Sequence, residues 1–66
     1  MITLFEVRQQ LRTVNRRWLE TVYSNTSERV ARGTYDSFVK ENPQDYFELV
    51  KVERNEECLA FTKIEN

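Results

Sequence analysis

Few side chains in this sequence belong to the types that carry out catalysis. Its 66 residues include no histidine, so the commonest general base and the usual activator of a nucleophile is missing. The single glycine, Gly33, excludes a glycine-rich phosphate-binding loop. Cys58 therefore has no histidine to activate it, and we expect a buried or inert thiol. Glu56 and Glu57 fall in an expected turn, where water surrounds both carboxylates, so the sequence predicts a protein that is not an enzyme.

The absence of histidine and of a second cysteine also excludes the disulfides and metal sites that often stabilise a small domain. One cysteine cannot form an intramolecular disulfide, and zinc sites need about four Cys and His ligands, so we expect no metal and no cofactor. A chain of this length buries only about 60% of the surface that its unfolded form exposes. The remaining sources of stability are good packing and self-association, and we expect a homodimer.

Residue types that are common in protein interfaces do occur. Tryptophan, tyrosine and arginine are enriched among the residues that contribute most to binding, and a small sheet has exposed edges that can pair with another chain. For Trp18 a core position is the alternative to an interface position. The candidate partner-binding residues are Arg12, Arg16, Arg17, Trp18, Tyr23 and Tyr46.

Charge is unevenly distributed along the chain. Residues 1–33 carry six arginines and three glutamates, a net charge of +3, whereas residues 34–66 carry four basic and eight acidic residues, a net charge of −4. The two halves can attract one another, or one of them can meet a charged partner. The arginines beside Trp18 also suit phosphate contacts and base stacking. The sequence pI of 5.4 nevertheless lies far below the value of about 9 that is typical of nucleic-acid-binding domains, so nucleic acid is the less favoured partner.

The sequence also predicts where in the cell the protein is located. The first residues lack the basic segment and apolar run of a signal peptide, and no apolar stretch approaches the roughly 20 residues of a membrane span. We therefore expect a cytoplasmic protein without a membrane partner.

Residues 25–42 have the pattern of one helix. Asn25 followed by Glu28 is typical of a capped start, and Pro43 should end the helix by disfavouring helical geometry at Asn42. Gly33 weakens the helix by about 1 kcal/mol relative to alanine. Its presence is explained either by a close approach of the helix to the sheet or by tolerance of glycine at the surface. An apolar stripe that we expect to face the core consists of Val30, Ala31, Thr34, Tyr35, Phe38 and Val39.

Two strands are predicted after this helix. Residues 45–53 and 58–64 are rich in strand-forming types, and the turn at residues 54–57 should join them as an antiparallel hairpin. Apolar side chains occupy both faces of the first of these strands: Phe47 and Leu49 alternate with Tyr46, Val50 and Val52. One face should pack on the helix, and the other is a partner surface or the site of a bulge.

Residues 3–23 allow two interpretations. Leu4, Val7 and Leu11 begin a stripe with helical spacing, which favours one long helix over residues 3–23. The aromatic and β-branched residues between Trp18 and Tyr23 favour a hairpin, with residues 12–16 as its loop. With the hairpin, the chain is an α+β domain of order ββαββ, a small antiparallel sheet with one helix on one face. The alternative is ααββ.

The chain also resembles small accessory proteins encoded by tailed bacteriophages. The resemblance covers about residues 17–52 and rests on Trp18, residues 21–24, Ala31, Tyr35, and residues 42–50 with their Asn-Pro stop. Such a family implies a non-catalytic protein that binds and inhibits a host enzyme or defence complex by surface occlusion in the host cytoplasm. It supports the hairpin and supplies no functional residues. The alternatives are a nucleic-acid-binding adaptor that uses the Arg/Trp segment and a structural homodimer.

Overall fold

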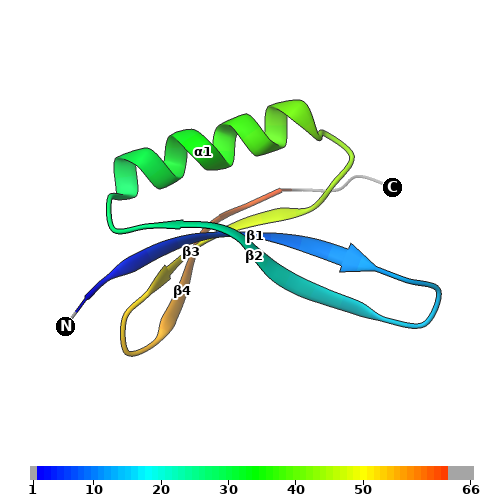
Figure 1. Cartoon of the computed structure of the whole chain (residues 1–66), viewed down its shortest axis with the longest axis horizontal. Coiled ribbons are helices and arrows are strands. Elements are labelled where there is room, and N and C mark those ends of the chain that lie inside the picture. Colours follow the sequence, from blue (N-terminus) through cyan, green and yellow to red (C-terminus); the bar gives the residue numbers. More distant parts are fainter. Residues whose placement is uncertain (1, 63–66) are drawn as a thin grey trace.

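The computed structural model describes residues 2–62 and has the order ββαββ (Figure 1). This confirms the predicted α+β class, and the alternative of a long helix over residues 3–23 is wrong. Its elements are β1 (Leu4–Arg12), β2 (Arg17–Asn25), α1 (Glu28–Glu41), β3 (Phe47–Val52) and β4 (Glu56–Phe61).

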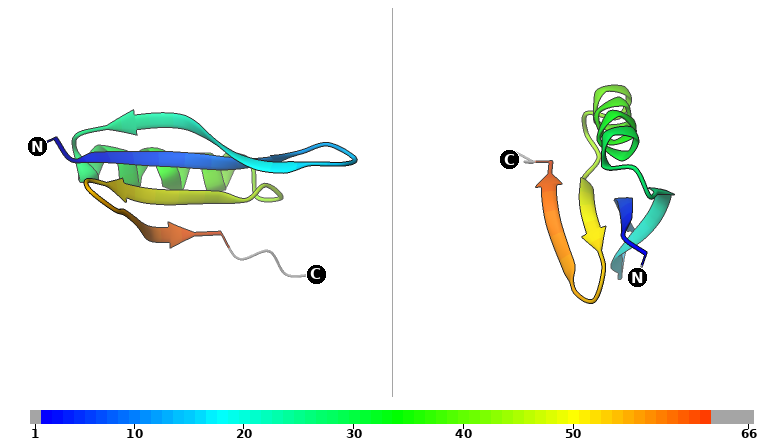
Figure 2. Two further views of the ribbon diagram at one scale, coloured as in Figure 1. Left: turned by 90° about the horizontal axis from the view of Figure 1, so that it is seen from below. Right: turned by 90° about the vertical axis from the view of Figure 1, so that its left-hand side faces the viewer.

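The four strands form one antiparallel sheet of order β2-β1-β3-β4, so β2 and β4 are its edges. Each edge strand contains one residue more than its neighbour can match. Val7 pairs with Tyr23 and Arg8 with Thr21, which leaves Val22 as a bulge in β2. Leu59 is the corresponding residue of β4. Bulges bend a strand and increase its twist, and the sheet is visibly twisted in Figure 2.

Helix α1 covers one face of the sheet and leaves the other face open (Figures 1 and 2). The Phe38 and Phe47 rings stack with centroids 5.5 Å apart, which joins the helix to β3. Side chains along β1 and β3 point alternately to the two faces of the sheet, so every second one points into the space between the sheet and α1. The buried cluster between helix and sheet consists of Phe5, Val7, Ala31, Phe47 and Leu49.

The helix begins later than the sequence predicts. Asn25 is the last residue of β2 and pairs with Phe5, so it cannot also be the first cap of the helix. Ser27 is the N-cap, and its hydroxyl accepts a hydrogen bond from the Val30 N–H at 3.4 Å. The Asn25 side chain instead accepts from the Ser27 N–H at 2.8 Å, and Glu28 pairs with Arg32 at 2.7 Å. The predicted stop is confirmed, because Asn42 is the C-cap.

One expectation for the helix surface is wrong, and at Gly33 the structure decides between the two explanations. Ala31 is fully buried where α1 meets the sheet, which turns the neighbouring Val30 to the side and leaves it 45% exposed. At Gly33 an added Cβ would meet no heavy atom within 4 Å, so the glycine does not serve a close approach to the sheet. Of the other stripe residues, Tyr35, Phe38 and Val39 pack against the core as predicted.

The second hairpin is confirmed with shifted boundaries. The turn lies at residues 53–55, where the Glu53 N–H donates to the Asn55 carbonyl at 3.2 Å, so Glu56 and Glu57 belong to β4. Cys58 is exposed rather than buried, because it lies on the edge strand β4, opposite Val50 on the face that α1 does not cover. The last predicted strand residues, 63 and 64, lie outside the described part of the chain.

Candidate protein interface

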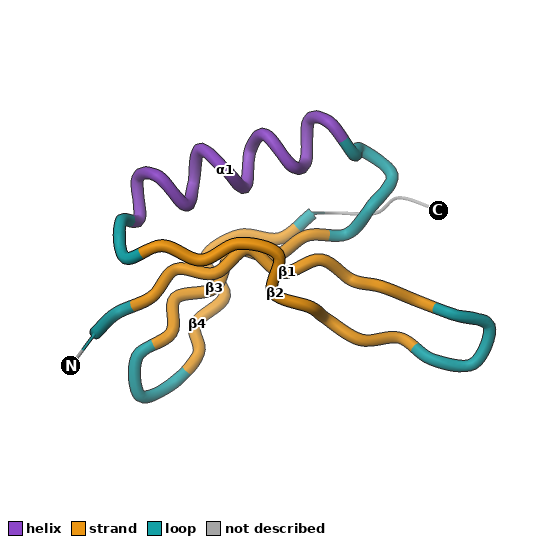
Figure 3. The backbone as a smooth tube through the Cα atoms, viewed as in Figure 1, coloured by secondary structure: helices purple, strands orange, loops and turns teal. Residues whose placement is uncertain are grey.

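The hairpin of β1 and β2 extends beyond the rest of the sheet (Figures 1 and 3). Both strands have nine residues, whereas β3 and β4 have six, and β1 pairs with β3 only as far as Gln9. The Gln10 N–H donates to the Tyr46 carbonyl at 2.9 Å, and this bond marks the end of the sheet proper. We call residues 10–19 the arm. It contributes to the longest dimension of the molecule, 38 Å.

Three arginines gather at the end of the arm. A hydrogen bond of 2.8 Å from the Thr13 N–H to the Arg16 carbonyl closes the loop, and Arg12 lies directly opposite Arg17. Like charges in such a pair repel. None of the salt bridges within residues 2–62 involves Arg12, Arg16 or Arg17, so the end of the arm carries an uncompensated positive charge. A hollow of about 400 Å³ lies among residues 12–17.

Apolar side chains accompany these charges. The Arg16 guanidinium lies 5.6 Å from the centre of the Trp18 ring, which makes a cation–π contact. Trp18 is 37% exposed, so it is not a residue of the buried core. Val14 is fully exposed at the tip, and Leu19 and Val22 are exposed on β2. These last three were not among the sequence-derived candidates, because their exposure depends on how far β1 and β2 extend beyond β3, which local composition does not specify.

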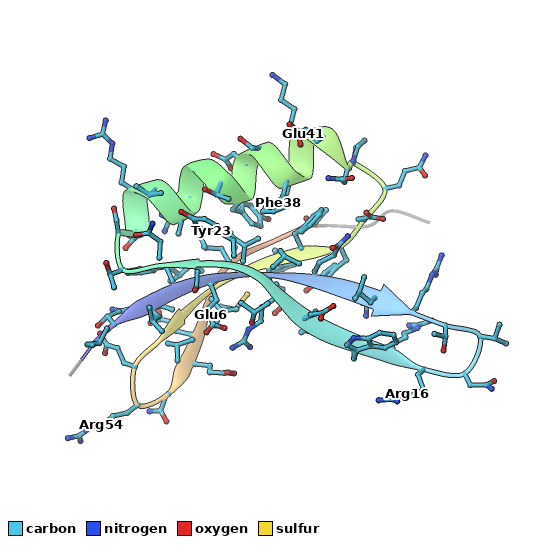
Figure 4. All side chains as sticks on the ribbon, in the orientation of Figure 1. Glu6, Arg16, Tyr23, Phe38, Glu41 and Arg54 are labelled. Atoms are coloured by element: carbon cyan, nitrogen blue, oxygen red, sulfur yellow. The ribbon has the colours of Figure 1, made fainter. Side chains whose placement is uncertain are left out.

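The two candidate tyrosines lie away from the arm end. Tyr23 packs against the core under α1, near Phe38 in Figure 4, and its hydroxyl accepts from the Asn25 amide at 2.9 Å. Tyr46 lies at the base of the arm, where it helps to line a cleft of about 390 Å³ with Gln10 and Arg12. Burial and a hydrogen bond of 2.8 Å to Glu48 raise the pKa of Tyr46 to about 12. The structure therefore places all of Arg12, Arg16, Arg17 and Trp18 at the end of the arm, with Arg12 and Arg17 on one face and Trp18, beside Arg16, on the other. Tyr46 lies nearby and Tyr23 lies apart.

The open face of the sheet holds a charged cluster that the sequence did not reveal. Arg8 of β1 pairs with Glu6 at 2.9 Å and reaches across β3 to Glu56 of β4, also at 2.9 Å. This bridge crosses Val50, which is only 3% exposed although α1 lies on the other face. The Thr21 hydroxyl of β2 donates to Glu6 at 3.1 Å, so the cluster joins residues of β2, β1 and β4 and crosses β3.

Electrostatics within this cluster follow from its hydrogen bonds. The bond to Glu56 raises the pKa of Arg8 above its ordinary value, and the same bond lowers the pKa of the Glu56 carboxyl. Two carboxylates share one guanidinium, which leaves the cluster with a net charge of −1 at neutral pH, counted from Glu6, Arg8 and Glu56. The sheet therefore carries a negative cluster on its open face and a positive arm end.

The described residues hold neither a candidate metal site nor a helix that could span a membrane. Within residues 2–62 no group of three or more Cys, Asp or Glu side chains is placed to hold a metal ion. No helix in this part of the chain is long and apolar enough to cross a membrane. Comparisons of the chain with protein-family models, with curated proteins and with solved structures returned no match.

Proposed function

We propose that this chain is a non-catalytic protein-binding module that inhibits a host enzyme or defence complex by occluding one of its surfaces. The observation that carries the proposal is the end of the arm beyond the sheet, which holds Arg12 and Arg17 on one face and Trp18, beside Arg16, on the other. The resemblance to small phage proteins supports the inhibitory role and the host cytoplasm as its place of action.

The chemistry of the arm indicates the kind of surface that it fits. Guanidinium groups form paired hydrogen bonds with carboxylates, and a tryptophan contributes a large contact area with few rotatable bonds. Val14 adds an apolar contact at the tip. The matching partner surface is acidic with an apolar centre. Binding there would block access to that surface without any chemical step.

Affinity purification from bacterial cells tests the proposal. A tagged chain would be cross-linked in the cells and purified, and its partners identified by mass spectrometry. Arg17→Ala and Trp18→Ala should each lose the partner that the unmodified chain retains. Arg54→Ala and Phe61→Ala are the matched controls, since both side chains are exposed away from the arm, and both variants should keep the partner. If the folded arm variants retain every association, the arm is not the binding surface.

Nucleic-acid binding is the second candidate, because Arg16 stacks over Trp18 as in sites that bind single strands. The acidic second half of the chain opposes it. Trp18 is the only tryptophan, so its fluorescence reports base stacking directly. We expect no change when a single-stranded oligonucleotide is added at low salt. Saturable quenching that weakens as salt rises would favour nucleic acid over protein as the partner.

A further inference from the structure

The outer edge of β2 has main-chain groups that are available for pairing. In an antiparallel ladder, residues alternate between bonding to one neighbour and pointing away from it. The hydrogen bond from the Thr13 N–H to the Arg16 carbonyl sets this alternation, so Trp18 and Glu20 bond toward β1. Arg17, Leu19 and Thr21 therefore direct their N–H and C=O groups outward. The Gln10 N–H donates to the carbonyl of Tyr46, the residue before β3, and so points away from β2. Gln10 is the partner of Leu19, so the main-chain groups of Leu19 should likewise point away from β1.

This edge is better suited to pairing than the edge of β4. Arg17 to Thr21 pair with β1 in unbroken register up to the bulge at Val22, and this run contains neither proline nor glycine. The bulge at Leu59 interrupts the shorter β4 in its middle. Bulges, charge and short length are the usual means by which an edge strand avoids another chain. The nine-residue β2 has its bulge beyond Thr21, and its run from Arg17 to Thr21 carries two charges of opposite sign, Arg17 and Glu20.

We propose that the chain forms a homodimer in which the β2 edges of two copies pair antiparallel, with Leu19 at the two-fold axis. Leu19 then exchanges main-chain hydrogen bonds with Leu19 of the second copy. Arg17 exchanges main-chain hydrogen bonds with Thr21 of the second copy. By symmetry, Thr21 does the same with Arg17 of the second copy. The outward groups of all three residues are satisfied, and two four-stranded sheets become one continuous sheet with both helices on the same face.

Charge complementarity favours a second copy in this register. Arg17 comes to lie opposite Thr21 of the second copy, whose own partner on β1 is Arg8, a guanidinium that already pairs with Glu6 and Glu56. On the other face, Trp18 comes to lie opposite Glu20 of the second copy, and Arg16, which stacks on Trp18, lies diagonal to that carboxylate. Arg16, which has no salt bridge in the described part of one copy, therefore gains an acidic neighbour.

The homodimer goes beyond the proposed function and does not depend on it. Edge pairing uses the rim of the sheet and leaves its two faces available. The paired run of residues 17–21 includes Arg17 and Trp18 of the arm, whereas Arg12 and Val14 lie outside it. One dimer therefore presents the tips of two arms to a partner protein, and Arg17 and Trp18 belong to both surfaces.

Sedimentation velocity of the whole chain over a range of concentrations tests the pairing. Leu19→Lys places two like charges opposite one another and should raise the dimer dissociation constant by about tenfold or more. Phe61→Lys introduces the same charge at another exposed apolar position on the open face and should leave the dimer intact. Circular dichroism would show that both variants keep their fold.

Mixing two variants tests the two-fold axis itself. Leu19→Lys and Leu19→Glu should each be monomeric alone and should form a heterodimer when mixed, since only a residue opposite its own copy gives this result. A wild-type chain that stays monomeric at every concentration would overturn the proposal. A dimer that survives Leu19→Lys, or that is lost in Phe61→Lys, would overturn it as well, because the interface would then lie elsewhere.

Discussion

Gly33 lies on an exposed turn of α1 where the structure has room for a side chain. An added Cβ meets nothing within 4 Å, and the residue does not have a positive φ. Gly33→Ala should therefore stabilise the domain by about 0.5–1 kcal/mol, because alanine loses less backbone entropy in a helix. Thermal unfolding should show a rise in Tm of a few degrees. A lower Tm would mean that the helix surface at this position is covered.

At Glu56, stability is linked to pH through the ion pair with Arg8. The pKa of the Glu56 carboxyl is lower in the folded chain than in the unfolded chain, so the unfolded state binds more protons as pH falls. The contribution of this pair is therefore complete above the unfolded pKa of about 4.3 and is lost as pH falls through the folded value. Urea unfolding between neutral and acidic pH should show this loss.

The matched variants for that measurement are Glu56→Gln and Glu57→Gln. Glu56→Gln should unfold at a lower urea concentration at neutral pH and should lose less stability on acidification than the wild type. Glu57 is exposed and lies outside the salt bridges of the described residues, so Glu57→Gln should follow the wild-type pH profile. Equal profiles for all three chains would show that the Arg8 bridge adds nothing to folding.

Among the elements, boundaries that depend on local chemistry could be predicted from the sequence, and boundaries that depend on strand pairing could not. The Asn42-Pro43 stop was predictable, because proline restricts the residue before it wherever the chain goes. The helix start was not, because the length of β2 decides whether Asn25 belongs to a strand or a cap, and that length depends on pairing with Phe5. The arm could not be predicted for the same reason, because it arises from the unequal lengths of the strands. Its arginines were visible in the sequence, but their common projection beyond the sheet was not.

The direction of the main-chain groups in β2 gives a prediction for this element. In a monomeric chain, such as the Leu19→Lys variant, the amides of Arg17, residue 19 and Thr21 should exchange quickly with solvent, and those of Trp18 and Glu20 more slowly. The physical reason is that only the second set bonds to β1. Amide exchange followed by NMR resolves this alternation. The reverse pattern would show that another register closes the hairpin and would remove the basis of the paired edge.

The whole molecule is a thin sheet with a helix on one side, and its stability should depend on association. Only six hydrophobic residues of the described chain are buried, so a small core supports the fold. Pairing of two β2 edges would stabilise the folded state by mass action, since the unfolded chain has no such edge. The Tm of the wild-type chain should therefore rise with protein concentration, and the Tm of Leu19→Lys should not. Phe61→Lys should behave like the wild type. A wild-type Tm that is independent of concentration, from dilute solution to the concentration used for NMR, would argue that the domain folds and acts as a monomer.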